Sequence, residues 1–163
     1  MSDLIGLIPL APLLSFLFIG LVNKDLTKGW VSFIACGSVF VSFVLSAVLY
    51  FGLLNAAEGQ AAFTYTAFEW ISAGNFSASI AFLVDPLSVV MMLIITGVGF
   101  LIHVYSVGYM HTDDGYHRFF MYLNLFIFFM LLLVMGSNYL LMFVGWEGVG
   151  LCSYLLIGFW FKN

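Results

Sequence analysis

The stretch MFVGWEGVGLCSYLLIGFW, residues Met142–Trp160, carries one charged side chain, Glu147, among residues that are otherwise apolar, small or weakly polar. At about 1.5 Å per residue, a helix of this length nearly crosses the roughly 30 Å of hydrocarbon in a bilayer. The stretch therefore predicts a membrane-spanning helix. A charged side chain at the middle of a bilayer costs roughly 2.5–3.5 kcal/mol on insertion scales, so Glu147 needs a compensating interaction.

The composition of the whole chain extends this prediction. Hydrophobic residues make up 64% of the chain and charged residues 7%, and the mean hydropathy is +1.15. This leaves too little polar surface for a soluble globule, so we expect an integral membrane protein. With 4 basic residues and a net charge of −4, the chain lacks the basic surface needed to bind nucleic acid or to lie on an anionic membrane. The lipid bilayer is the expected surrounding.

Five segments are long and apolar enough to cross the membrane. They are Leu4–Val22, Trp30–Leu54, Val84–Tyr109, Phe119–Met135 and Tyr139–Trp160. The predicted fold class is all-α and integral to the membrane. We divide it into two helices in residues 1–54, an external loop in residues 55–83, and three helices in residues 84–163.

The external loop has the alternating pattern of a β-hairpin. Apolar side chains alternate with threonines from Phe63 onward, the sequence SAGN at 72–75 breaks the pattern, and alternation resumes at Phe76. A two-stranded ribbon is marginal by itself, so we expect it to pack on its own helices or on a neighbouring subunit. Asp85 and Pro86 then fit the N-cap and the first position of the third helix.

The basic residues predict the orientation. All four share one side of the five-helix arrangement: Lys24, Lys28, Arg118 and Lys162. By the positive-inside rule that side, and with it the C-terminus, is cytoplasmic. The N-terminus and the acidic residues Glu58, Glu69 and Asp85 then lie outside.

Glu147 is the main candidate for chemistry. A carboxylate in an apolar helix can take up a proton, because burial disfavours its charged form, or it can pair with a cation or a chain of waters. Intramembrane ionisable residues are functional by default, so we interpret Glu147 as a proton-transfer residue. Gly150 adds no bulk beside it, and Tyr154 offers a hydroxyl two turns away on the same helix face. The alternative is a glutamate that stays protonated and only hydrogen-bonds a neighbouring helix.

Other polar side chains in the spans carry weaker signals. His103 could pass protons toward the cytoplasmic end of the third span, although a hydrogen-bonded packing role fits the imidazole equally well. His111 and His117 fall in a polar connection and are expected to be solvated. Arg118 is expected to anchor its helix at the interface, and Asn124 to hydrogen-bond a partner helix.

Small residues in the spans predict close helix packing. In the second span they recur at every fourth position, as Ser38, Ser42 and Ser46. The glycines of GVGFLI (97–102) and GVGLCS (148–153) lack the strand context of a dinucleotide site and are expected to pack helices. Cys36 and Cys152 lack the spacing of a zinc site or a disulfide framework, so we predict no metal site.

Four motifs give the chain a family resemblance. They are FLVDPLSVV (82–90), LIHVYSVGYMH (101–111), RFFMYLNLFIF (118–128) and VGWEGVGLCSYLLIGFW (144–160). Together they resemble the N-terminal part of the largest antiporter-like subunit of proton-pumping NADH:quinone oxidoreductase, respiratory complex I. This subunit is called chain L in bacteria and chain 5 in mitochondria. The first two spans agree with the family only in character.

The resemblance implies a role for Glu147 and a set of partners. In this family the glutamate of GWEGVG, which matches Glu147, lies in a proton channel and works with a lysine on a later helix as quinone reduction drives pumping. The implied partners are other membrane subunits of complex I. NADH, FMN, iron–sulfur clusters and quinone are expected in partner subunits, with no cofactor or redox active site in this chain. The implied location is a bacterial cytoplasmic membrane rather than the mitochondrial inner membrane.

The resemblance also implies a longer protein. The family's subunit is several times longer, and no lysine occurs inside the five predicted spans. The remainder after Asn163 is therefore expected as a partner, either as a second chain or as a continuation of this one. Two other functions stay open: the related large subunit of a multisubunit sodium/proton antiporter, and an inert membrane scaffold. Partner subunits with flavin and iron–sulfur clusters would favour the oxidoreductase.

Overall fold

The computed structural model describes residues 2–22, 26–55, 62–74 and 76–160, which form five helices and one two-stranded sheet. The helices are α1 (Ser2–Leu21), α2 (Lys28–Leu54), α3 (Pro86–Tyr109), α4 (Tyr116–Met135) and α5 (Tyr139–Ile157). The strands are β1 (Phe63–Ala73) and β2 (Phe76–Val84). Within the described residues, all five helices are long and apolar enough to span a membrane. The predicted fold class is confirmed.

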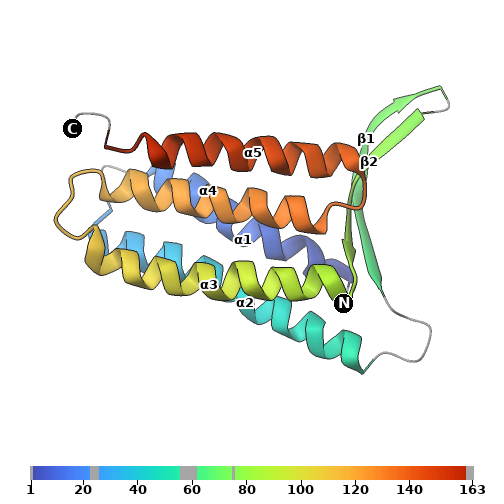
Figure 1. The fold of residues 1–163 in the computed structure, drawn as a ribbon, viewed down its shortest axis with the longest axis horizontal. Coiled ribbons are helices and arrows are strands. Elements are labelled where there is room, and N and C mark those ends of the chain that lie inside the picture. Colours follow the sequence, from blue (N-terminus) through green and yellow to red (C-terminus); the bar gives the residue numbers. More distant parts are fainter. Residues whose placement is uncertain (1, 23–25, 56–61, 75, 161–163) are drawn as a thin grey trace.

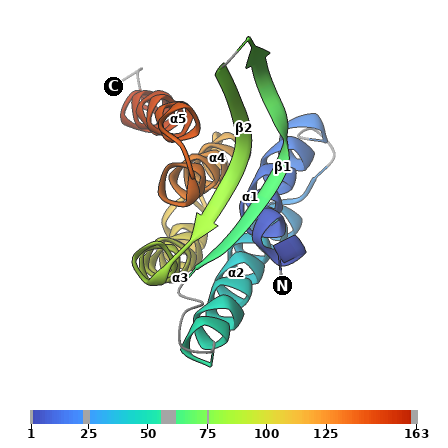
Figure 2. The same ribbon diagram turned by 90° about the vertical axis from the view of Figure 1, so that its right-hand side faces the viewer.

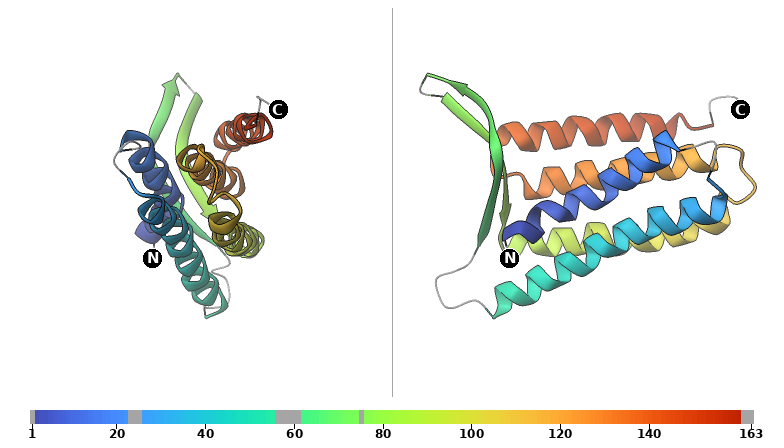
Figure 3. Two further views of the ribbon diagram at one scale, coloured as in Figure 1. Left: turned by 90° about the vertical axis from the view of Figure 1, so that its left-hand side faces the viewer. Right: turned by 180° about the vertical axis from the view of Figure 1, so that it is seen from behind.

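The helices lie side by side, and the hairpin crosses one end of the bundle (Figure 1). Helix α1 packs on α2 and α4, and α2 packs on α3. Within the described residues, α5 contacts only α4 and β2. The end-on views show α5 at the edge of the bundle, with α4 beside it (Figures 2 and 3). One long face of α5 is therefore uncovered by this part of the chain.

The start of α3 has the local structure that the sequence predicts. Asp85 is its N-cap and Pro86 its first residue. The Asp85 carboxylate accepts the backbone N–H of Ser88 at 2.7 Å, and the Ser88 hydroxyl accepts the backbone N–H of Asp85 at 2.8 Å. This capping box satisfies two backbone donors that the helix leaves unpaired. The hydrogen bond from Ser88 also lowers the pKa of Asp85 below its ordinary value.

Helix α4 begins earlier than predicted, at Tyr116 instead of Phe119. The Tyr116 side chain is buried, and its hydroxyl hydrogen-bonds Ser32 on α2. His117 is therefore inside the first turn, where its Nε2 lies 2.8 Å from the carbonyl oxygen of Leu26. The expectation that His117 is solvated is only partly right, because the side chain is half-buried and one ring nitrogen is within hydrogen-bonding distance of Leu26.

Helix α5 ends earlier than predicted, at Ile157 instead of Trp160. Gly158 is its C-cap, and the Phe159 ring packs edge-on against Phe119 of α4, with 5.4 Å between the ring centroids. The last residues are apolar, so the sequence predicts a longer span. The contact with Phe119 involves a distant segment of the chain and cannot be seen in the local sequence.

The hairpin packs on its own helices. Its strands are antiparallel, from Phe63 opposite Val84 to Ala73 opposite Phe76. The Asn138 side chain, at the start of α5, donates a hydrogen bond to the Ser79 carbonyl at 2.7 Å. The expectation of packing within the chain is confirmed, and the hairpin ties the α4–α5 turn to the rest of the fold (Figure 2).

Two details of the hairpin explain its course. On α1, an added Cβ at Gly6 would lie 2.9 Å from the Tyr65 ring, so glycine there admits the strand. At the turn, Gly74 has a φ of 59°, a conformation that glycine adopts without steric cost. Asn75, the last residue of the SAGN break, lies outside the described residues.

The small residues of the helices pack as expected. The Ser38 hydroxyl donates to Asn124 Oδ1 on α4 at 2.8 Å, and the Ser42 hydroxyl donates to the Ile8 carbonyl on α1 at 2.7 Å. These bonds confirm that the serine stripe of α2 faces partner helices and that Asn124 bonds one. Gly99 of α3 likewise packs against α4, where an added Cβ would lie 2.7 Å from the tip of a neighbouring isoleucine.

The end of the bundle opposite the hairpin carries the basic side chains that are described. Lys28 donates to the carbonyl oxygens of His111 and Asp113 at 2.8 and 3.2 Å, and Arg118 places its guanidinium 4.9 Å from the centre of the Phe159 ring. Both side chains lie at the same end of the bundle, as the predicted orientation requires. Which side of a membrane that end faces stays a prediction. Three residues of that argument lie outside the described residues: Lys24, Lys162 and Glu58.

Candidate functional site

Helix α5 meets α4 through two glycines that flank Glu147. An added Cβ at Gly145 would lie 2.5 Å from the backbone nitrogen of Leu133, and one at Gly148 would overlap the Phe129 ring. Both glycines are buried. Because any side chain at either position would collide with α4, the two glycines allow a close approach. Gly145 touches the α4 backbone, and Gly148 leaves room for the Phe129 ring. This close contact fixes which way α5 faces.

Glu147 points away from the α4 contact. Successive residues of a helix are rotated by about 100°, so Glu147, Gly150 and Tyr154 fall on the side opposite the two packing glycines. All three are exposed on the described part of the chain, and an added Cβ at Gly150 would meet nothing within 4 Å. We call this surface, with Trp146 beside it, the outer face of α5.

The outer face confirms two expectations and corrects one. Gly150 leaves free space beside the carboxylate, and Tyr154 lies on the same face. The expectation that both glycines of GVGLCS pack helices is right for Gly148 but wrong for Gly150 in the described part of the chain, because only Gly148 points toward α4. The two glycines of GVGFLI do pack: Gly97 lies against Phe43, as Gly99 lies against α4.

The chemical character of Glu147 follows from this placement. No hydrogen bond or ion pair of its carboxylate is found within residues 2–22, 26–55, 62–74 and 76–160. The helix around it is apolar and long enough to cross a membrane. In a bilayer, the outer face would therefore hold an acid at hydrocarbon depth, an arrangement that requires a further partner.

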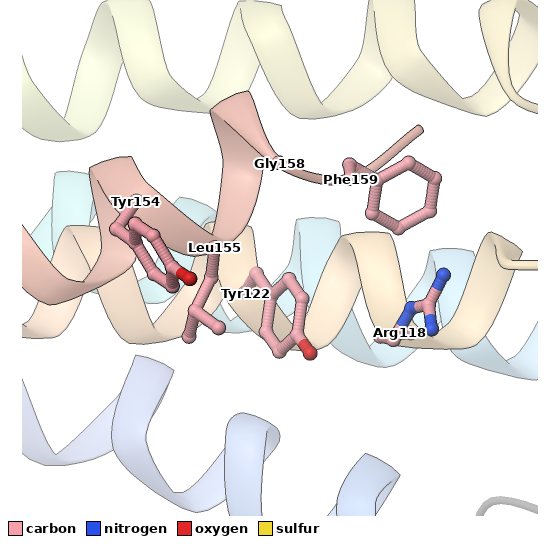
Figure 4. Close-up of a pocket in the computed structure, with 6 residues that line it drawn as sticks. All are labelled: Arg118, Tyr122, Tyr154, Leu155, Gly158 and Phe159. Atoms are coloured by element: carbon pink, nitrogen blue, oxygen red, sulfur yellow. The ribbon is translucent and has the colours of Figure 1, made fainter. Parts of the chain in front are cut away.

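Tyr154 lines a cavity of about 290 Å³ between α4 and α5 at the basic end of the bundle (Figure 4). The lining residues are Arg118, Tyr122, Tyr154, Leu155, Gly158 and Phe159. Two phenol hydroxyls and one guanidinium are its polar groups, so the cavity suits water or an anion. The sequence does not single out Tyr122, because only the packing of α4 on α5 brings it beside Tyr154.

His103 lies elsewhere in the fold. Its side chain is 1% exposed in α3, and its Nδ1 is 2.7 Å from the Gly99 carbonyl oxygen. Helix α3 packs on α4, and within the described residues it makes no contact with α5. The structure thus places Tyr154 on the same face of α5 as Glu147, but it leaves α4 between His103 and Glu147.

Comparison with known proteins supplies the family. The profile described as NADH-Ubiquinone oxidoreductase (complex I), chain 5 N-terminus, matches residues 70–120. The NADH-quinone oxidoreductase subunit L of Neisseria meningitidis serogroup A is 43% identical over 158 residues, which is 96% of this chain. Those of Pseudomonas aeruginosa and Escherichia coli K12 are 42% and 39% identical over 161 residues, or 99% of this chain.

The resemblance to the N-terminal part of subunit L is confirmed. This chain spans only about a quarter of its relatives' length, 23% of the Neisseria subunit L and 26% of the other two. The profile match ends before α5, whereas the 161-residue matches to subunit L extend over the part of this chain that contains Glu147. Glu147 therefore lies in a region of clear similarity to subunit L.

Proposed function

We propose that this chain is the N-terminal part of a membrane subunit of a proton-translocating NADH:quinone oxidoreductase, and that Glu147 is one of its proton-transfer residues. The names of the relatives support the complex, and five apolar helices support a place in its membrane part. The observation that carries the role of Glu147 is its position, at the middle of α5 and opposite the α4 contact.

The outer face of α5 suits a site shared with another segment. The relatives are about four times longer than this chain, so in a subunit of that length further helices would cover Glu147. We propose that one of them brings a cation, as the family's lysine does, to within a few ångströms of the carboxylate. An opposite charge at that distance favours the ionised acid, and its withdrawal favours the protonated one. Movement of the cation would then load and release a proton.

The interaction energy of two nearby charges can be compared with the energy needed to pump one proton. Moving one charge across 100 mV requires about 2.3 kcal/mol. Two unit charges 4 Å apart interact by about 4 kcal/mol at the effective dielectric constant typical of protein surfaces. The change in interaction energy when a cation moves away from Glu147 is therefore large enough to move one proton across the membrane.

Tyr154 is the second residue of the proposed path. It is two turns from Glu147, about 10 Å along the helix axis, which is too far for a direct hydrogen bond. Water in the cavity beside Arg118 and Tyr122 would bridge part of that distance from the basic end. His103 has no comparable route, because α4 separates it from Glu147. A direct part for His103 in proton transfer stays a prediction.

The remaining features of the proposal come from the family. NADH, FMN, iron–sulfur clusters and quinone would be bound by partner subunits. The membrane would be the bacterial cytoplasmic membrane, with the hairpin outside and the basic end in the cytoplasm. The relatives named above are oxidoreductase subunits, which favours this function over a sodium/proton antiporter.

The decisive experiment replaces Glu147 by glutamine in the full-length subunit. Glutamine keeps the size and hydrogen bonds of the side chain but cannot ionise. In inverted membrane vesicles, we expect the Glu147→Gln complex to assemble and to build a smaller pH gradient for each NADH oxidised. Glu69→Gln, on the exposed part of the hairpin, is the matched control and should leave the gradient unchanged. An unchanged gradient with Glu147→Gln would assign α5 a scaffold role only.

A further inference from the structure

The imidazole of His103 is held in one tautomer by its own helix. Its Nδ1 lies 2.7 Å from the Gly99 carbonyl oxygen, which can only accept a hydrogen bond. Nδ1 therefore carries the proton. In the neutral ring, Nε2 is then a bare acceptor that requires a donor.

No described residue supplies that donor. The side chain is 1% exposed, and Nε2 has no hydrogen-bond partner within the described part of the chain. It is also the only buried side-chain nitrogen or oxygen among the described residues in this condition. Buried polar atoms in native proteins nearly always have a partner, so an exception points to a ligand or a bound water.

The neighbouring face of α4 carries a hydrogen-bond donor, on Asn124, that also lacks a partner. The ring of Phe120 lies 6.1 Å from that of His103, and Ile127 packs against Gly99. Asn124 lies between Phe120 and Ile127 at helical spacing, so it is on the α4 face that meets α3 at this level.

The hydrogen bonds of Asn124 leave one N–H free. Its Oδ1 accepts from Ser38 at 2.8 Å, and one N–H of its amide donates to the Phe120 carbonyl at 3.0 Å. The described residues offer no acceptor to the second N–H, although the side chain is 0% exposed. His103 thus lacks a donor and Asn124 lacks an acceptor, yet the two side chains do not bond each other directly.

We propose that the contact between α3 and α4 contains a binding site for one water molecule, which accepts from the Asn124 amide and donates to His103 Nε2. Only a small molecule that both donates and accepts can satisfy the two groups, and water is the smallest. The bound water completes one hydrogen-bonded chain across three helices, from Ser38 of α2 through Asn124 of α4 to His103 of α3. This role is independent of Glu147 and of proton pumping.

The direct test is a cryo-EM map of the full-length subunit in its assembled membrane complex, at a resolution that reveals ordered water. We expect a density peak within hydrogen-bonding distance of both His103 Nε2 and Asn124 Nδ2. A map with no peak there, or with a protein donor on Nε2, would overturn the proposal.

A second test measures the coupling between the two side chains. His103→Phe keeps a ring but removes the acceptor, and Asn124→Leu removes the donor. If a water joins them, the double variant should lower the thermal unfolding temperature by less than the sum of the two single variants.

The control pairs His103→Phe with Thr96→Val. The Thr96 hydroxyl is buried in the same helix but bonds only within it, to the Met92 carbonyl at 2.6 Å. The effects of this pair should be additive. Additive effects of the His103 and Asn124 variants as well would contradict the water bridge.

Discussion

Helix α4 separates two titratable side chains that stand in opposite surroundings. On one side, His103 is packed between α3 and α4 and is 1% exposed. On the other side, Glu147 is on the outer face of α5, which the described part of the chain leaves uncovered. Both residues lie inside helices of membrane-spanning length and apolar composition. The hydropathy of the sequence therefore does not distinguish the two residues. Only the packing of neighbouring helices shows that the imidazole is buried and the carboxylate exposed.

This difference shows how the two sides of α4 are built. On the α3 side, the close contact at Gly99 is with a flexible side chain, that of Ile127 on α4. On the α5 side, Gly145 lies against the backbone of Leu133, while Gly148 lies against the ring of Phe129. A side chain can move aside, whereas a helix backbone cannot, so the two sides should respond differently to added bulk.

The largest expected effect comes from Gly145→Ala. The new methyl group would press on the backbone of Leu133, so we expect a loss of about 3 kcal/mol, at the upper end of overpacking costs. Gly99→Ala on the α3 side meets only the movable tip of Ile127 and should cost about 1 kcal/mol or less. The measurement is the thermal stability of the full-length subunit in detergent.

Gly150→Ala is the control within α5, because it adds the same methyl group on the outer face. Equal losses for Gly145→Ala and Gly99→Ala would contradict the proposed contrast between the two sides. A loss for Gly150→Ala would show that another segment closes tightly over the outer face.

A smaller effect is expected at the start of α5, where Asn138 both caps the helix and holds the hairpin. Its Oδ1 accepts the backbone N–H of Leu141 at 2.9 Å, and its amide donates to Ser79. Asn138→Ala removes both bonds and should cost about 1–2 kcal/mol. Asn138→Asp keeps the cap and loses only the bond to the hairpin, so it should cost less. Unfolding midpoints of the two variants test this order, and the reverse order would contradict the capping role.

The smallest effect is a pH dependence at the basic end. The Trp160 indole N–H donates to Asp113 at 2.8 Å, which, with the backbone N–H of Gly115, lowers the pKa of Asp113 below its ordinary 3.8. The folded state thus favours the ionised acid. This contribution to stability is complete above the ordinary pKa and is lost as the pH falls below it. A fluorine label on Trp160 should report release of the indole in acid, and Asp113→Asn should abolish that response.

Much of the fold could be predicted from the sequence because a bilayer imposes few solutions. Five long apolar segments become helices, and alternation with a glycine turn becomes a hairpin. The errors are at helix ends. Tyr116 extends α4 because its side chain packs on α2, and α5 ends before Phe159, whose ring packs on Phe119. Such contacts join residues far apart in the chain and leave no local pattern.

The candidate site could be predicted only in part. Glu147 is visible in the sequence because an acid in an apolar segment has a known energetic cost. Its direction depends on Gly145 and Gly148, whose packing partners on α4 cannot be identified from spacing alone. The orphaned nitrogen of His103 is likewise a property of three helices together, and the side chain by itself gives no sign of it.

The glycine contact between α4 and α5 limits how the acid can be regulated. Because Gly145 touches the backbone of Leu133, sliding or rotation of α5 against α4 would cause a steric collision, so α5 holds Glu147 in a fixed position. If Glu147 transfers protons as proposed, a change in the electric field that acts on it must then come from the segment that covers the outer face of α5. In that case the carboxylate of Glu147 stays in place, and the charged group that faces it is the part that moves.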